Sequence, residues 1–228
     1  MQWSRDSLTE RQGNIAGKGA CCNEMDIWEA NARVTSIAPH VCKHSGLYKC
    51  TGDECGFLGE CDEWGCSYNP YALGNPDFYG LGLRVDTRRP YTVVTQFPAI
   101  QGKMTEIRRL YVQDGRVIQN AAVNLTGRPV QNVMNDDYCT AKPGAERYME
   151  LGGMEAMGGA LSRGMVLIFS IWWDEGGFMQ WLDGGDAGPC NTTEGDPKNI
   201  VKIEPKPAVV FSNVKWGEIG STYSGKKW

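Results

Sequence analysis

Short runs of β-branched and aromatic residues, separated by turn-forming residues, constrain the fold of this chain most. They occur at 91–97 (YTVVTQF), 109–113 (RLYVQ), 116–123 (RVIQNAAV), 165–173 (MVLIFSIWW) and 208–216 (AVVFSNVKW). Runs of this length and composition are typical of strands in antiparallel sheets. Asp114 and Gly115 lie between two of the runs and predict a tight hairpin turn. The sequence therefore predicts a single mostly-β domain, either an antiparallel sandwich or a barrel.

One helix is expected, over 153–163 (GMEAMGGALSR). Met154, Met157 and Leu161 share one face of such a helix. A stripe of methionine and leucine at this spacing indicates core packing rather than a cofactor site.

Composition excludes some classes of partner. The net charge is −4, which gives no electrostatic basis for binding nucleic acid or an anionic membrane. The longest apolar run, 164–173, is too short to span a bilayer. With 41% hydrophobic residues, the chain has enough apolar material for a packed core.

Nine cysteines are present, and five of them fall within 42–66. None of these five forms a C-x2-C pair, and His40 and His44 do not complete a zinc-finger spacing. A loop stapled by disulfides in an oxidising compartment is the favoured interpretation, and no metal is expected. Sequons at Asn124 and Asn191 agree with a secreted glycoprotein. The opening residues lack the apolar core of a signal peptide, so we expect the signal outside this chain, or the chain to begin partway through a longer protein.

Three acids, Glu24, Asp26 and Glu29, lie close together in NEMDIWEAN. In a strand, alternation would direct Glu24, Asp26 and Trp28 to one face. Met25 and Ile27 would then anchor the opposite face in the core. Glu29 has the wrong parity, and a single β-bulge between Asp26 and Glu29 would bring it onto the face of the other acids.

With such a bulge, Glu24 and Glu29 would be four strand steps apart, roughly 13 Å between Cα atoms. Side chains that lean inward would leave roughly 5–6 Å between the carboxyl groups, a separation typical of retaining glycosidases. Asp26 would hydrogen-bond the nucleophile and help to hold the two pKa values apart. A strand edge with solvated acids and no chemistry is the alternative. A calcium loop is disfavoured by Met25, Ile27 and Trp28 between the acids.

Together with its neighbours, this stretch resembles the secreted fungal family 7 glycoside hydrolases. The resemblance rests on CCNEMDIWEAN, APHVC, TGDEC, NPDFYG, NDDYC, SRGMVLIFSIWWD and NVKWGEIGST, in this order. It covers residues 13–224 as a partial catalytic domain, with an unmatched leader at 1–12 and a tail at 225–228. The family implies an all-β fold, a curved antiparallel β-sandwich of jelly-roll type, and retaining hydrolysis of β-1,4-glucosidic bonds.

On matching positions, the resemblance implies Glu24 as nucleophile, Glu29 as acid/base and Asp26 as the supporting acid. His40 would lie beside these carboxylates, the alternative being a loop histidine satisfied by backbone groups. Trp172 would stack a sugar on the glycone side and Trp181 one on the leaving-group side, since an indole matches the apolar face of a pyranose. Without the resemblance, both tryptophans would be assigned to the core.

The resemblance also implies the disulfides Cys42–Cys61, Cys50–Cys55 and Cys66–Cys139. Cys21, Cys22 and Cys190 would pair with cysteines of a preceding half of the family's domain, so the chain is expected to be the C-terminal half and truncated on its N-terminal side. Strand edges left uncovered by this truncation would have to be covered by repacking or by an oligomer.

The expected function is that of a retaining endo-β-1,4-glucanase acting on a cellulose or β-glucan chain. Short segments between Cys55 and Cys61 and between Trp181 and Cys190 favour an open cleft over the tunnel of cellobiohydrolases. Two alternatives stay open: an inactive or glucan-binding fragment, and a related specificity such as a cellobiohydrolase or a glucanase for mixed-linkage glucan or xylan. No cofactor is expected, because two carboxylates and water are sufficient for the reaction.

Overall fold

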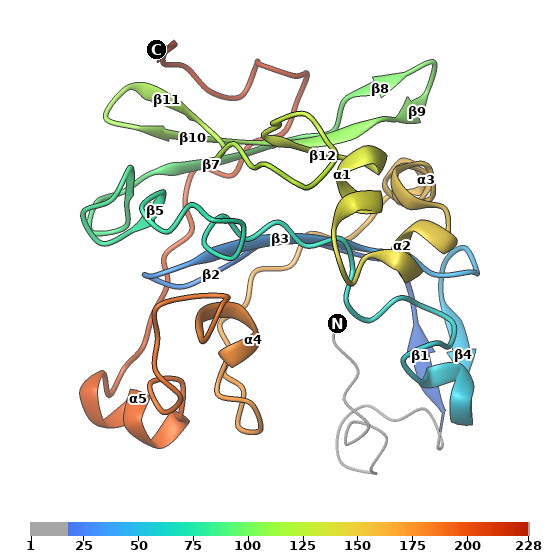
Figure 1. The fold of residues 1–228 in the computed structure, drawn as a ribbon, viewed down its shortest axis with the longest axis horizontal. Coiled ribbons are helices and arrows are strands. Elements are labelled where there is room, and N and C mark those ends of the chain that lie inside the picture. The colour runs from blue at the N-terminus through green and yellow to red at the C-terminus, as the bar shows by residue number, and fades with distance from the viewer. Residues whose placement is uncertain (1–17, 228) are drawn as a thin grey trace.

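The computed structural model describes residues 18–227, so the expected leader at 1–12 lies outside the described residues. The chain forms two facing layers of strands, with short helices along one side and below (Figure 1). No helix in the described part is long and apolar enough to cross a membrane. The expected all-β sandwich is confirmed, although its loops contain helices that the sequence pattern did not predict.

The upper layer is a five-stranded sheet built around β10 (Glu106–Gln113). β7 (Thr92–Gln96) pairs with one edge of β10, while β11 (Arg116–Gln119) and β12 (Val133–Asn135) share the other edge. All three pairings are antiparallel, and β13 (Lys226–Lys227) adds a parallel pairing to β11. The predicted runs at 91–97 and 116–123 contain β7 and β11, and the run at 109–113 lies within β10.

The lower layer is the hairpin of β2 (Glu24–Ala30) and β3 (Thr35–His40). Three small two-stranded sheets complete the strands: β1 (Gly19–Cys21) with β4 (Tyr48–Cys50), β5 (Tyr79–Gly80) with β6 (Val85–Asp86), and β8 (Ala99–Ile100) with β9 (Lys103–Met104). The helices are η2 (Gly52–Cys55), α1 (Asp136–Ala141), α2 (Glu146–Glu150), α3 (Gly153–Arg163), α4 (Gln180–Asp183) and α5 (Pro197–Ile203).

The predicted turn at Asp114-Gly115 is confirmed. Gln113 pairs directly with Arg116, so the loop between β10 and β11 has two residues. Their φ angles are 51° and 72°, and such a pair of positive angles defines the turn type that matches the twist of a hairpin.

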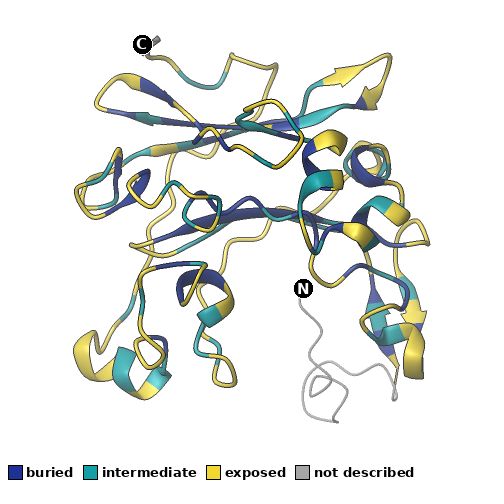
Figure 2. Cartoon of the chain, in the orientation of Figure 1, coloured by how far each residue is buried: buried dark blue, intermediate teal, exposed yellow. Residues whose placement is uncertain are grey.

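A single large core cluster joins the two layers and the helices. Ile37 and Val41 contribute from β3 and the residue after it, and Ile107 and Met134 contribute from the upper sheet. Met25 packs against this cluster, as predicted for the underside of the acidic strand. Figure 2 shows the buried residues concentrated in the strands of both layers and in α1–α3. The strand that carries the acids is thus fixed by the main core, which lies between it and the upper sheet.

The expected helix at 153–163 is α3, and its apolar face is part of the core. Met154 and Met157 are fully buried, and Leu161 packs against them from a half-buried position. The prediction of core packing for this stripe is confirmed.

Replacing Met157 with alanine is expected to lower the free energy of unfolding by about 2–5 kcal/mol, because the cavity left behind forfeits the contacts of a buried side chain. Denaturant titration followed by circular dichroism measures this change. Met165→Ala is the matched control, since Met165 is 38% exposed, and its change should stay within about 0.5 kcal/mol. Equal effects of the two substitutions would contradict the assignment of Met157 to the core.

The predicted strands at 165–173 and 208–216 are wrong for this structure. Both segments run without secondary structure, and their large side chains are exposed, with Val166 at 87% and Trp216 at 89%. Phe169 and Phe211 contact each other, with ring centroids 4.7 Å apart. A strand exists only with a hydrogen-bonded neighbour, and the described residues provide none beside these two segments.

Three disulfides are present: Cys42–Cys61, Cys50–Cys55 and Cys66–Cys139. These are the pairings that the resemblance implies. Among the described residues, Cys21, Cys22 and Cys190 are free thiols, and Cys21 is buried. Two of the disulfides cross-link residues within 42–66, and the third ties this segment to α1.

Candidate active site

The register of the β2–β3 hairpin determines on which face of the strand the three acidic side chains lie. Glu24 pairs with His40, Asp26 with Ala38 and Glu29 with Ser36. Three residue steps on β2 therefore oppose two on β3, and the irregularity lies between Asp26 and Glu29. The predicted bulge is confirmed.

The bulge places all three acids on one face. Ser36, Ala38 and His40 alternate along β3, so their side chains share a face, and so do those of their partners on β2. His40 and Ser36 are four steps apart, which separates the Cα atoms of the paired Glu24 and Glu29 by roughly 13 Å. This is the spacing expected when two carboxyl groups lean toward a shared substrate atom.

Trp28 does not share the face of the acids, contrary to the prediction from strict alternation. Its ring lies edge-on to Tyr91 at 6.2 Å and to Phe211 at 5.9 Å. The bulge explains the difference, because it reverses the alternation between Asp26 and Glu29.

The bulge is held from the opposite layer by Arg109. This residue lies on β10, is only 4% exposed, and its guanidinium donates to the carbonyl oxygen of Ile27. A carbonyl turned out of the β2–β3 ladder by the bulge thereby gains a charged donor. The upper sheet thus fixes the shape of the strand that carries the acids.

His40 lies beside Asp26. Its Nε2 is 3.1 Å from Asp26 Oδ2, and its Nδ1 is 3.5 Å from Asp62 Oδ1. Burial by itself would lower the pKa of the imidazole, but hydrogen bonds to Asp26 and Asp62 outweigh burial and raise this pKa to about 9. His40 is therefore a cation at neutral pH and pairs with Asp26 as an anion.

Glu29 has the environment of a general acid. Burial and the negative charge of Asp26 together outweigh the opposing charge of His40 and raise the pKa of its carboxyl group to about 7. A carboxyl group with such a pKa holds its proton in weakly acidic and neutral solution and can donate it.

Trp172 and Trp181 lie together. Their ring centroids are 6.1 Å apart with an interplanar angle of 15°, and both side chains are exposed, at 52% and 39%. The assignment of one to each side of the scissile bond stays a prediction.

The helix that carries Trp181, α4, is joined to the end of β2. The side-chain amide of Asn31 donates to Asp183 Oδ2 at 2.6 Å, while Asn31 Oδ1 accepts from the backbone N–H groups of Arg33 and Val34. These contacts fix the orientation of the Asn31 amide. One residue therefore ends the acidic strand and ties it to the segment with the exposed indole.

Sequence reasoning missed Asn31, Asp183 and Asp62. Asp62 is one of several acids in the cysteine-rich segment 42–66, and no local pattern distinguishes it from its neighbours. Its contact with His40 arises from the Cys42–Cys61 disulfide, which was predicted only by resemblance. Asp62 follows Cys61, and Cys42 lies two residues after His40, so the implied Cys42–Cys61 disulfide is the signal that could have placed Asp62 near the histidine.

A hollow of about 430 Å³ lies between β7 and residues 217–222, and none of the three acids lines it. The candidate site is instead the face of β2 and β3 that carries the acids, where β2 is half-buried and β3 is mostly buried. A β-sandwich with a pair of carboxylates on one strand face, one protonated up to neutral pH, has the parts of a glycoside hydrolase.

Comparison with known proteins identifies the family. Residues 1–223 match the sequence profile of Glycosyl hydrolase family 7, and the chain belongs to this family. Endoglucanase type C of Fusarium oxysporum is 58% identical over 217 residues, which are 94% of this chain and 50% of that protein. The chain spans about half the length of the curated relatives it matches.

Solved structures agree with the family and with the fold. The native endocellulase EGI of Humicola insolens superposes with a TM-score of 0.89 at 56% identity, over 92% of this chain and 54% of that one. A family 7 cellobiohydrolase from Daphnia pulex is more distant, with a TM-score of 0.77 and 34% identity over 82% of this chain and 48% of its own.

Proposed function

We propose that this chain carries the catalytic strand of a retaining endo-β-1,4-glucanase that acts on cellulose and related β-glucans. The observation that carries the proposal is the bulged register of β2 and β3, which aligns Glu24, Asp26 and Glu29 on one face. The pKa of Glu29, raised to about 7 by burial, supplies the acid that such a reaction requires.

In the first half of the reaction, Glu29 protonates the glycosidic oxygen while the Glu24 carboxylate attacks the anomeric carbon. The C–O bond to the leaving sugar breaks, and a covalent glycosyl ester forms on Glu24. In the second half, Glu29 takes a proton from water, the water attacks the anomeric carbon, and Glu24 leaves as a carboxylate. Proton and charge balance without a cofactor.

Asp26 acts between these two groups. Its negative charge contributes to the raised pKa of Glu29, and its ion pair with His40 fixes its carboxyl group. We assign Asp26 as the supporting acid, His40 as the cation that holds it, and Trp172 and Trp181 as sugar platforms.

Internal cleavage is favoured over processive release of disaccharides. Endoglucanase type C of Fusarium oxysporum and endocellulase EGI of Humicola insolens are 58% and 56% identical, whereas the cellobiohydrolase of Daphnia pulex is 34% identical. The short segments between Cys55 and Cys61 and between Trp181 and Cys190 leave little chain for a roof. Three disulfides support action in an oxidising, extracellular setting.

Hydrolysis of soluble carboxymethyl cellulose by the purified chain tests the proposal. A rapid fall in viscosity with few new reducing ends indicates internal cuts, while reducing ends without a viscosity change indicate attack at chain ends. A folded chain that produces neither would support the alternative of a glucan-binding or inactive module.

Trp181→Ala is expected to raise KM for carboxymethyl cellulose roughly tenfold, with a smaller effect on kcat. A stacked aromatic contact contributes about 0.5–1.5 kcal/mol beyond area burial, and 1.4 kcal/mol corresponds to a factor of ten. Initial rates over a range of substrate concentrations give both constants. Trp64→Ala is the matched control, because Trp64 is 61% exposed and packs on Phe57. An unchanged KM in Trp181→Ala would remove this residue from the binding surface.

A further inference from the structure

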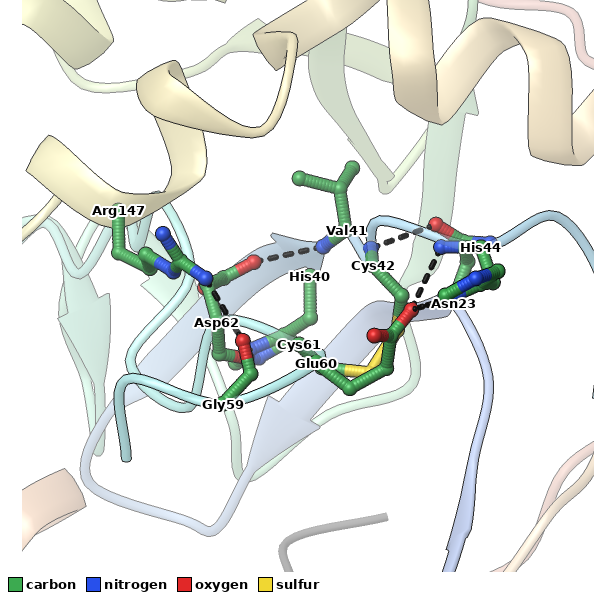
Figure 3. Close-up of a disulfide and its surroundings, with 10 residues drawn as sticks. All are labelled: Asn23, His40, Val41, Cys42, His44, Gly59, Glu60, Cys61, Asp62 and Arg147. Atoms are coloured by element: carbon green, nitrogen blue, oxygen red, sulfur yellow. Dashed lines mark hydrogen bonds and ion pairs between the residues drawn. A yellow bond between two sulfur atoms is a disulfide. The ribbon is translucent and has the colours of Figure 1, made fainter. Parts of the chain in front are cut away.

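Asp62 is a buried acid that the mechanism above does not use. Its side chain is 1% exposed. Oδ2 accepts from the backbone N–H of Val41 at 2.6 Å, and Oδ1 accepts from the backbone N–H of Gly65. Figure 3 shows Asp62 directly after the Cys42–Cys61 disulfide, with its carboxyl group directed to the backbone next to His40. Its position is therefore fixed by backbone groups and by a covalent cross-link.

The loop that carries Asp62 is tied at both ends. Cys61 is bonded to Cys42, two residues after His40, and Cys66 is bonded to Cys139 on α1. Asp62 therefore has little freedom to move away from the imidazole.

His40 lies between two carboxylates. Nε2 is 3.1 Å from Asp26 Oδ2, and Nδ1 is 3.5 Å from Asp62 Oδ1 and 3.4 Å from the Asp62 carbonyl oxygen. A neutral imidazole has one N–H and one lone pair, so it can satisfy an acceptor on only one side. Acceptors face both ring nitrogens here, and only the imidazolium, with two N–H groups, satisfies both.

We propose that Asp62 is a positioning residue that keeps His40 doubly protonated and directed at Asp26, so that Asp26 stays fixed as an anion between Glu24 and Glu29. The catalytic part of this inference rests on the proposed function. The charge state of His40 is a separate property, which can be measured whether or not the chain hydrolyses glucan.

The charges around His40 are consistent with this role. Asp26 and Asp62 face the ring, Glu24 is the cross-strand partner of His40, and the charge of His40 lowers the pKa of Glu29. These neighbours are all acids. Together they favour the imidazolium over the neutral ring.

Glu60 offers a matched control on the other side of Cys61. It is 4% exposed, and its Oε1 accepts from the backbone N–H of His44 at 2.6 Å and lies 2.5 Å from His44 Nδ1. The His44 ring stacks on Tyr48, and Figure 3 shows Glu60 directed to His44 and Asp62 to the backbone next to His40. Glu60→Gln thus removes a buried carboxylate paired with a histidine, in the same loop, without touching His40.

The experiment is a titration of the imidazole signals by NMR. The chain has only two histidines, so His44→Gln assigns both resonances. Asp62→Asn is expected to lower the pKa of His40 by about one unit or more, since a nearby opposite charge shifts a pKa by about 1–3 units. Glu60→Gln should leave the titration of His40 unchanged. No change in Asp62→Asn, or an equal change in both variants, overturns the proposal.

Two further readouts keep the test decisive. In the unsubstituted chain, ¹⁵N shifts at pH 7 should show both ring nitrogens of His40 protonated, and one unprotonated nitrogen overturns the proposal even if Asp62→Asn fails to fold. On carboxymethyl cellulose, Asp62→Asn should lower kcat about tenfold with little change in KM, while Glu60→Gln retains the rate. If the unsubstituted chain is inactive, the proposed function fails, and the state of His40 still decides the role of Asp62.

Discussion

Replacing Glu24 with glutamine is expected to lower kcat on carboxymethyl cellulose by at least about four orders of magnitude, the scale seen when a catalytic nucleophile is removed. An amide oxygen is a poor nucleophile, so the glycosyl ester cannot form. Glutamine has almost the same shape, and Glu24 lies on a strand whose underside is fixed by Met25 in the core. Folding should therefore be retained, and viscosity and reducing ends measured together report the loss.

Glu155→Gln is the control for this substitution. Glu155 is an exposed residue on α3 that pairs with Lys103, and the same chemical change there should leave kcat within a factor of two. A second readout is covalent. A slowly released 2-fluoro cellobioside should add its mass to the unsubstituted chain and not to Glu24→Gln. If the Glu24→Gln variant also gained the mass of the cellobioside, another carboxylate would be the nucleophile.

The hairpin turn, α3 and the acidic strand could be predicted because each depends on neighbours in the sequence. Asp114 and Gly115 determine the type of hairpin turn locally, and the three-residue spacing of Met154 and Met157 places both side chains on one face of a helix. The bulge could also be predicted, since an apolar residue at 25 and acids at 24, 26 and 29 cannot all take suitable faces in a regular strand.

The two wrong strands show where local pattern is insufficient. Residues 165–173 and 208–216 have the composition of strands, yet strand pairing depends on a second segment, and the described residues leave both exposed. The helices α1, α2, α4 and α5 were missed because each has four to seven residues, too few for a helical period to appear.

The site was predictable in part. Glu24, Asp26 and Glu29 are adjacent in sequence, so their chemistry could be inferred from one strand. Asp62 reaches His40 through a disulfide and two backbone amides, and no sequence spacing encodes that contact. The family resemblance supplied the remaining roles.

Replacing Glu29 with glutamine is expected to lower kcat on carboxymethyl cellulose by about 10²–10⁴, the usual contribution of a general acid. A sugar leaving group needs a proton from Glu29, whereas a dinitrophenolate does not. On a dinitrophenyl cellobioside, the variant should therefore form the glycosyl ester at near the original rate. Hydrolysis of this ester should then be slow, because glutamine cannot take the proton from the attacking water. A burst of dinitrophenolate followed by a slow phase is the signature to measure.

The pH profile gives an independent test of the same residue. Glu29 must be protonated to act as the acid, and burial raises its pKa to about 7. Activity of the unsubstituted chain should therefore fall as pH rises through about 7, whereas a carboxyl group with an ordinary pKa would lose its proton above about pH 4.3. Glu29→Gln has no proton to lose there, so its residual activity should lack this limb. If the limb persists in the variant, another group sets it, and Glu29 is not the general acid.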